Sequence, residues 1–184
     1  MIRARIGFTL VCFFIATIAY AGDFKLSSPA IKSGASLSEE QVFNGFGCSG
    51  KNKSPALQWT KGPVGVKSYA ITVYDPDAPT GSGWWHWVVY NIPENVTALP
   101  VNAGDVSGKG LPSGAIQGRT DFGTHAFGGA CPPQGDAPHR YIFTVHALKI
   151  EKIDVDPEAS AAMIGFMINA NALGKASFTA TYGR

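Results

Sequence analysis

Ten consecutive residues decide the fold: Trp84-Trp85-His86-Trp87-Val88-Val89-Tyr90-Asn91-Ile92-Pro93. β-Branched and aromatic side chains favour a strand, and Pro93 ends it because proline has no backbone N–H to donate to a sheet. Both faces of the run are apolar, which is typical of a strand that is buried on both sides. The run therefore predicts a central strand in a sheet that other elements cover on both faces.

Further strands are predicted on either side of this run. Residues 66–74 are rich in β-branched and aromatic side chains and end at Asp75-Pro76. Residues 141–148 alternate, with Tyr141, Phe143 and Val145 on one face and Ile142, Thr144 and His146 on the other. We also expect a short first strand over residues 24–26 and a short terminal strand or extended tail over residues 178–182.

One helix is predicted late in the chain. Asp156-Pro157-Glu158 supplies an N-cap, a first helical residue and an early acid, and the helix should continue to Leu173. Gly174 would then be its C-terminal cap. Several strands followed by one helix favour a mostly β fold, an antiparallel β-sandwich with a C-terminal helix.

The composition excludes several classes of protein. The chain has 184 residues, of which 45% are hydrophobic and 15% are charged, with 22 glycines and 12 prolines. This length fits one domain, and the hydrophobic fraction is too high for a disordered chain. The formal net charge of +2 gives no electrostatic case for binding nucleic acid.

The first 21 residues have the order of a secretory signal peptide. Arg3 and Arg5 precede an apolar run over residues 6–18, and Ala19-Tyr20-Ala21 supplies small residues at a cleavage site. A membrane anchor is the alternative, but the run is short of the roughly 20 residues that span a bilayer, and Val11 before Cys12 disfavours a lipoprotein. We therefore expect residues 1–21 to be cleaved and residues 22–184 to be a single periplasmic domain, with no stable membrane insertion.

Cleavage changes the charge balance and the cysteine count. Removing Arg3 and Arg5 from the 15 basic residues leaves 13, which equals the 13 acidic residues. Cys48 and Cys131 remain, and an even pair in an oxidising compartment predicts a disulfide. The alternative is two buried thiols that never meet.

Polar residues gather at the ends of the predicted strands. Asp75-Pro76-Asp77-Ala78-Pro79 follows one strand, His86 lies in the tryptophan-rich strand, and His139 precedes another after the Gly- and Pro-rich residues 94–138. Each has a plainer interpretation, as a solvated turn or a core histidine. A metal site of two histidines and a carboxylate lacks close ligand spacing, and no Gly-x-Ser-x-Gly elbow is present. The pattern therefore assigns no metal ligand and no catalytic residue.

Four segments in order resemble the phosphatidylethanolamine-binding protein family: residues 75–79, residues 84–93, Gly128-Gly129-Ala130-Cys131-Pro132-Pro133 and Pro138-His139-Arg140-Tyr141. Ser54-Pro55-Ala56-Leu57-Gln58-Trp59 also matches an early segment of the family. The resemblance covers essentially all of residues 22–184 and is nearest to the exported members of the bacterial Raf-kinase-inhibitor-like (YbhB/YbcL-type) branch. It implies a β-sandwich with a small anion pocket near its surface.

The resemblance also implies which residues form the pocket. These would be Asp75, Trp84, His86, His139 and Tyr141, with Gly129, Ala130 and Pro132 in one wall. Histidine and tyrosine can donate to phosphate-like oxygens. Because a carboxylate repels an anion, we expect Asp75 to accept from His86, orient it and favour its charged form. Asp77 would hold the turn, and Arg140 would pair with a carboxylate.

These expectations point to an exported, non-enzymatic binding protein, with a regulatory role left open. Its ligand would be phosphate-like or a phospholipid headgroup, without a cofactor. The alternative is an inhibitor or interaction protein that acts on an unidentified protein partner through exposed loops, with a vestigial pocket. A hydrolase that uses the histidines and Asp75 is a third reading, and a homodimer is left open.

Overall fold

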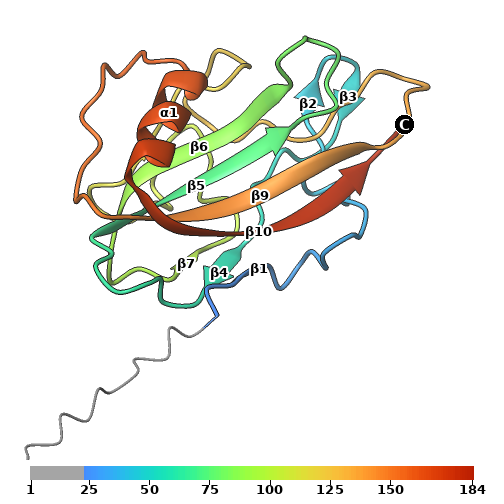
Figure 1. The fold of residues 1–184 in the computed structure, drawn as a ribbon. Coiled ribbons are helices and arrows are strands. Elements are labelled where there is room, and N and C mark those ends of the chain that lie inside the picture. The colour runs from blue at the N-terminus through green and yellow to red at the C-terminus, as the bar shows by residue number, and fades with distance from the viewer. Residues whose placement is uncertain (1–22) are drawn as a thin grey trace, which may run out of the picture.

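A five-stranded antiparallel sheet forms the centre of the fold (Figure 1). The computed structural model describes residues 23–184, so the predicted signal peptide, residues 1–21, lies outside the described residues. The strand order is β10-β9-β5-β6-β8. The bounds are β5 (Ser68–Asp75), β6 (Trp84–Pro93), β8 (Ile116–Gln117), β9 (His139–Leu148) and β10 (Ala172–Tyr182). The three long strands expected from sequence are therefore neighbours, with β5 between β6 and β9.

Two small sheets complete the β-structure. One has the order β1-β4-β7, with β1 at Leu26–Ser27, β4 at Leu57–Trp59 and β7 at Ala98–Leu99. The other is a hairpin of β2 (Asn44–Gly45) and β3 (Cys48–Ser49). The first strand thus begins at Leu26, whereas the sequence predicted residues 24–26. Backbone pairing explains the shift, because Leu26 and Ser27 are the residues that align with β4.

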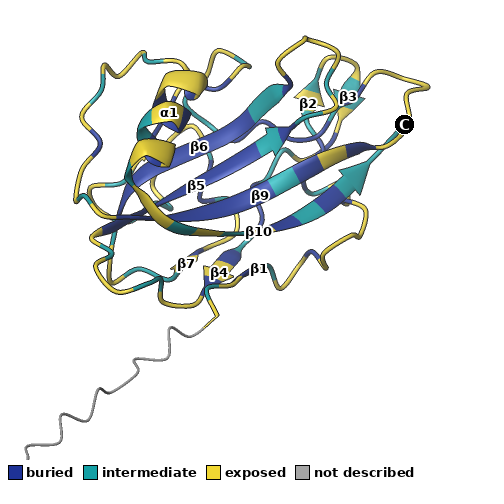
Figure 2. Cartoon of the chain, in the orientation of Figure 1, coloured by how far each residue is buried: buried dark blue, intermediate teal, exposed yellow. Residues whose placement is uncertain are grey.

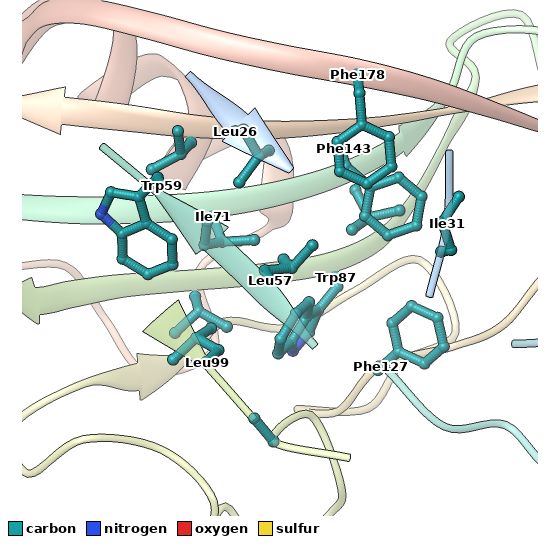
Figure 3. Close-up of a cluster of buried hydrophobic side chains, with 14 of the residues drawn as sticks. Leu26, Ile31, Leu57, Trp59, Ile71, Trp87, Leu99, Phe127, Phe143 and Phe178 are labelled. Atoms are coloured by element: carbon teal, nitrogen blue, oxygen red, sulfur yellow. The ribbon is translucent and has the colours of Figure 1, made fainter. Parts of the chain in front are cut away.

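The main core lies between the central sheet and the β1-β4-β7 sheet. Figure 3 shows Leu57 and Leu99 of the small sheet packed towards Ile71, Trp87 and Phe143 of the central strands. Buried residues concentrate along β5, β6 and β9 (Figure 2). The predicted antiparallel sandwich is confirmed, and Trp84–Pro93 is a central strand covered on both faces.

The helix covers the other face of the central sheet but begins later than predicted. Helix α1 spans Ala161–Asn171, and the Oγ atom of Ser160, its N-cap, accepts a hydrogen bond from the Met163 N–H at 3.2 Å. The expected cap, Asp156, accepts instead from the Glu158 N–H at 2.7 Å, which closes a local turn before the helix. Asp156 was therefore the wrong start, because its carboxylate is already used in that turn.

The terminal strand is longer than expected. β10 follows the helix at once and pairs with β9 along its length, from Ala172 opposite Leu148 to Tyr182 opposite His139. Gly174 is a strand residue opposite Ala147, so its prediction as a helix cap was wrong. Extended backbone at Ala172 ends the helix, and the hydrogen bonds of β9 hold the residues that follow.

Candidate binding pocket

A cavity of about 160 Å³ opens where β5 ends and β9 begins. Six of the predicted site residues line it: Asp75, Trp84, His86, Pro132, His139 and Tyr141. A buried cavity of roughly this size can hold a benzene molecule, so this one suits a group the size of phosphate rather than a whole lipid.

Asp75 is buried at the end of β5, and its oxygens are fully engaged. Oδ2 accepts from Nδ1 of His139 at 2.8 Å, and Oδ1 accepts from the N–H groups of Asp77 and Ala78 at 2.8 and 3.2 Å. The expectation that Asp75 orients His86 was wrong. β9 lies beside β5, and His139 at its start reaches the carboxylate, whereas His86 is turned to another partner.

His139 lies between two acidic side chains. Its Nδ1 atom binds Asp75, and its Nε2 atom lies 3.5 Å from Oδ2 of Asp136. Because Nδ1 donates to Asp75, the neutral ring has an unprotonated Nε2, and the charged ring donates from both nitrogens. The ring is 4% exposed, so its orientation is set by packing as well as by these contacts.

A β-bulge directs His86 into the pocket. Val73 pairs with Trp87 and Tyr74 pairs with Trp85, which leaves His86 without a partner on β5. The extra residue puts two successive side chains on the same face, so that Trp87 enters the core and His86 enters the pocket.

The surroundings of His86 favour the neutral form of its ring. Nδ1 donates to the carbonyl oxygen of Gly128 at 2.7 Å, which makes Nε2 the unprotonated atom. Burial lowers the pKa of His86 despite the opposing effects of the Gly128 carbonyl and Asp75. Asp75 does favour the charged form of His86, but burial opposes it more strongly, so the net effect is a lowered pKa.

Aromatic side chains surround these polar groups. The ring of Tyr141 meets His86 edge-on, with centroids 5.1 Å apart, and burial raises the pKa of its hydroxyl, so the hydroxyl keeps its proton. Phe122 lies against both Trp84 and His86, with ring centroids 5.5 and 5.3 Å away. The sequence reasoning did not select Phe122 or Phe46, which also lines the cavity, because aromatic residues in loops have no periodic pattern.

Gly129 and Ala130, predicted as pocket wall, do not line the cavity. Ala130 donates to the carbonyl of Gln41 at 3.0 Å, and its own carbonyl accepts from Phe43 at 2.9 Å. A Cβ atom on Gly129 would lie 2.2 Å from the Gln41 oxygen, so this close approach requires glycine. Gly129 and Ala130 therefore pack against residues 41–43 behind the cavity wall. Of the three residues predicted for this wall, Pro132 is the one that lines the cavity.

An ion pair fixes the turn after β5. Nε and one terminal nitrogen of Arg140 donate to the two oxygens of Asp77 at 2.9 and 2.7 Å, and the backbone N–H of Arg140 adds a third contact at 2.9 Å. These hydrogen bonds lower the pKa of Asp77 to about 2. Arg140 thus pairs with a carboxylate and anchors the turn that supplies two donors to Asp75.

A covalent bond and a guanidinium group join the two sides of the pocket rim. Cys48, in β3, forms a disulfide with Cys131, which lines the cavity. Arg184 donates to the carbonyls of Pro132 at 2.7 Å, Gly47 at 3.1 Å and Phe46 at 3.4 Å. The β2–β3 hairpin is therefore tied to the opposite wall.

Two further findings concern residues 23–184 as a group. Within them, no three histidine, cysteine or acidic side chains cluster so that they could hold a metal ion. No helix in this part of the chain is long and apolar enough to cross a bilayer.

Comparison with known proteins identifies the family. The family model described as phosphatidylethanolamine-binding protein matches residues 27–183. The chain belongs to this family. The pocket of Asp75, His86, His139 and Tyr141 is therefore the pocket of a family member.

The chain is similar to two proteins of Escherichia coli and to a more distant mycobacterial protein. UPF0098 protein YbcL of Escherichia coli is 57% identical and covers 92% of each chain, and UPF0098 protein YbhB of the same organism is 53% identical over 86% of this chain and 99% of its own. The crystal structure of E. coli YbcL superposes with a TM-score of 0.86 at 58% identity, over 88% of this chain and 98% of that chain. A more distant relative, 29% identical over 85% of this chain and 71% of its own, is named as the lipoprotein LppC of Mycobacterium tuberculosis.

Proposed function

We propose that this family member is an exported, non-enzymatic protein that binds a small anionic group in the pocket. The group is phosphate-like, either free or in a phospholipid headgroup. The convergence of two buried histidines and a buried tyrosine on one phosphate-sized cavity carries the proposal.

The hydrogen-bonding capacity of the pocket supports an anion. The protonated Tyr141 hydroxyl is a donor, and the free Nε2 atom of neutral His86 accepts from a protonated phosphate oxygen. Asp75 already accepts three hydrogen bonds, which reduces its repulsion of a bound anion. As the pH falls and His86 gains a proton, Nε2 becomes a donor, so affinity for phosphate should rise towards acidic pH.

The contacts of the histidines support binding rather than hydrolysis. Within residues 23–184, His86 and His139 bond to a carbonyl and to carboxylates, and neither hydrogen-bonds to a hydroxyl or thiol. A serine, threonine or cysteine nucleophile that a histidine activates requires that contact.

Export rests on the N-terminal pattern and on the name of one relative. Arg3, Arg5 and Ala19-Tyr20-Ala21 predict cleavage before Gly22, and the LppC relative is named as a lipoprotein. N-terminal sequencing of protein from fractionated cells should find Gly22 in the periplasm. A cytosolic pool that retains Met1 would contradict export.

The pocket is tested by calorimetric titration with inorganic phosphate and phosphorylethanolamine from pH 5.5 to 8. Loss of a hydrogen bond to the charged ligand should weaken binding about ten- to hundredfold in His86→Ala and in His139→Ala. His125→Ala is the matched control, because His125 bonds to Gln117 and Glu158, away from the cavity. Similar binding by all three variants would refute the pocket.

An exposed aromatic residue at the pocket rim favours one alternative function. Phe46 is 68% exposed, as an anchor for a protein partner would be. If the wild-type protein binds neither anion, the interaction-protein hypothesis, with a vestigial pocket, replaces the proposal.

A further inference from the structure

The β2–β3 hairpin at the pocket rim has an unusual residue at its tip. Gly45 pairs with Cys48, so Phe46 and Gly47 form a two-residue turn, with φ angles of +53° and +81°. Two positive φ angles are the pattern of a type I′ turn, which favours asparagine, aspartate or glycine at its first position. A phenylalanine there is strained, because its Cβ atom crowds the backbone in the left-handed region.

Packing does not explain this choice of residue. The Phe46 ring is 68% exposed, so burial offsets little of the backbone strain. Its neighbours are Phe43, at a centroid distance of 5.3 Å, and Phe122, at 5.8 Å and nearly parallel, with 13° between the planes. Strained residues that the surrounding structure enforces cluster at ligand sites, and Phe46 lines the cavity.

The hairpin also holds the ring in a fixed place. The Cys48–Cys131 disulfide joins it to the opposite wall, and Arg184 donates to the carbonyls of both turn residues. These contacts fix the backbone of the turn, so less freedom is lost there when a ligand packs against Phe46. The same guanidinium group brings a positive charge to this side of the rim, which favours an anionic ligand.

We propose that Phe46 is a specificity-determining residue and that the ligand is an aryl phosphate. Its phosphate would occupy the cavity, and its flat ring would stack on Phe46 beside Phe122. This inference rests on the proposed function, since it needs an anion in the pocket. It extends that function by naming the class of substituent that the anion carries.

The experiment compares three ligands by calorimetric titration: inorganic phosphate, cyclohexyl phosphate and phenyl phosphate. The two esters have similar size, and only one has an aromatic ring. Because aromatic pairs add attraction beyond burial, the wild-type protein should prefer phenyl phosphate over cyclohexyl phosphate by roughly three- to tenfold.

Phe46→Asn is the decisive variant, because asparagine suits the turn and removes the ring. It should unfold at a temperature no lower than the wild type and lose the preference for phenyl phosphate over cyclohexyl phosphate. Phe166→Ala is the matched control. Phe166 is 67% exposed on α1, which packs on the other face of the sheet, so its loss should leave all three affinities unchanged.

The outcomes separate the two proposals. If the wild-type protein binds inorganic phosphate without preferring the aryl ester, or if Phe46→Asn keeps the preference, the inference is overturned and the pocket proposal stands. Loss of inorganic phosphate binding in Phe46→Asn would also overturn it, because the ring would then shape the cavity rather than contact a substituent. If the wild type binds none of the three ligands, both proposals fail.

Discussion

Two histidines face the same cavity but belong to separate hydrogen-bonded pairs. His139 is bonded to Asp75, and His86 is bonded to the carbonyl of Gly128. Side chains in direct contact share their energetic effects, whereas side chains without shared partners act independently. The pocket should therefore show strong coupling between Asp75 and His139 and weak coupling between Asp75 and His86.

A double-mutant cycle on phosphate affinity tests this arrangement. Asp75→Asn with His139→Ala should lose no more affinity than the more severe single variant, because both changes disrupt one unit. Asp75→Asn with His86→Ala should lose affinity equal to the combined single effects within about 0.5 kcal/mol. Calorimetric titration measures each affinity. Coupling of Asp75 to His86 alone would contradict the hydrogen bonds described.

For individual residues, the sequence predicted which side chains line the pocket but not which of them hydrogen-bond to each other. Five polar or aromatic members, Asp75, Trp84, His86, His139 and Tyr141, do line one cavity. Alternation along β6 would place His86 and Trp87 on opposite faces, and a bulge brings them to the same face. A single inserted residue leaves no mark in composition or periodicity, so the partner of Asp75 could not be predicted.

Among the strands, β5 and β9 bury a histidine that the pocket does not use. Nε2 of His146 hydrogen-bonds to the hydroxyl of Thr72 at 3.1 Å, and its Nδ1 atom has no partner. Burial, with a smaller effect from Lys175, lowers the pKa of His146 to about 4. The unfolded chain therefore binds this proton below about pH 6.5, while the folded protein binds it only near pH 4. The free energy of unfolding should fall as the pH decreases across that window.

The contribution of His146 to the loss of unfolding free energy should be about 2 to 3 kcal/mol between pH 7 and pH 4.5. Urea unfolding at the two pH values measures it, and His146→Gln should lose correspondingly less over the same interval. His86 titrates in both proteins and cancels in the comparison, and Asp77, with a pKa of about 2, contributes only at lower pH. An equal loss in wild type and variant would show that His146 is not the responsible group.

The elements themselves were predicted unevenly. The three long strands followed from their runs of β-branched and aromatic residues, and each lies within two residues of its expected bounds. β9 starts two residues earlier than expected, at His139, and β5 starts two residues later, at Ser68. The helix start was wrong because Asp156 and Ser160 are both good caps, and Asp156 closes a local turn instead of capping the helix. Ser160 also forms a backbone bridge to Arg119, far away in sequence, which fixes the cap there.

For the whole molecule, the fold followed from four ordered segments, but the contacts between distant loops did not. The β2–β3 hairpin, Cys131 and Arg184 meet at the rim although they lie far apart in the chain. No local pattern marks Arg184 as a partner of Phe46 and Gly47, because its three acceptors are backbone carbonyls, which every residue has. Only the cysteine pair was visible beforehand, through its even number in an exported chain.

The disulfide should matter for both stability and binding. Cys48 and Cys131 are 83 residues apart, and a loop of that length is nominally worth about 4.5 kcal/mol of unfolded-chain entropy. A variant with Cys48→Ser and Cys131→Ser should lose roughly 2 to 5 kcal/mol of unfolding free energy. Because the covalent tie between the hairpin and Cys131 would then be lost, the affinity of the double variant for phosphate should also fall.

Urea unfolding and phosphate titration of the double variant measure the two effects. Thiol labelling of the denatured, unreduced wild-type protein is the control, and it should detect no reactive thiol at Cys48 or Cys131. Arg184→Ala in the intact disulfide background separates the two ties, since it removes three hydrogen bonds to the rim and leaves the covalent bond. If phosphate affinity falls in the double variant but not in Arg184→Ala, the disulfide is the contact that positions the hairpin at the pocket rim. If neither variant changes affinity, the hairpin does not position the pocket, and the disulfide acts on folding alone.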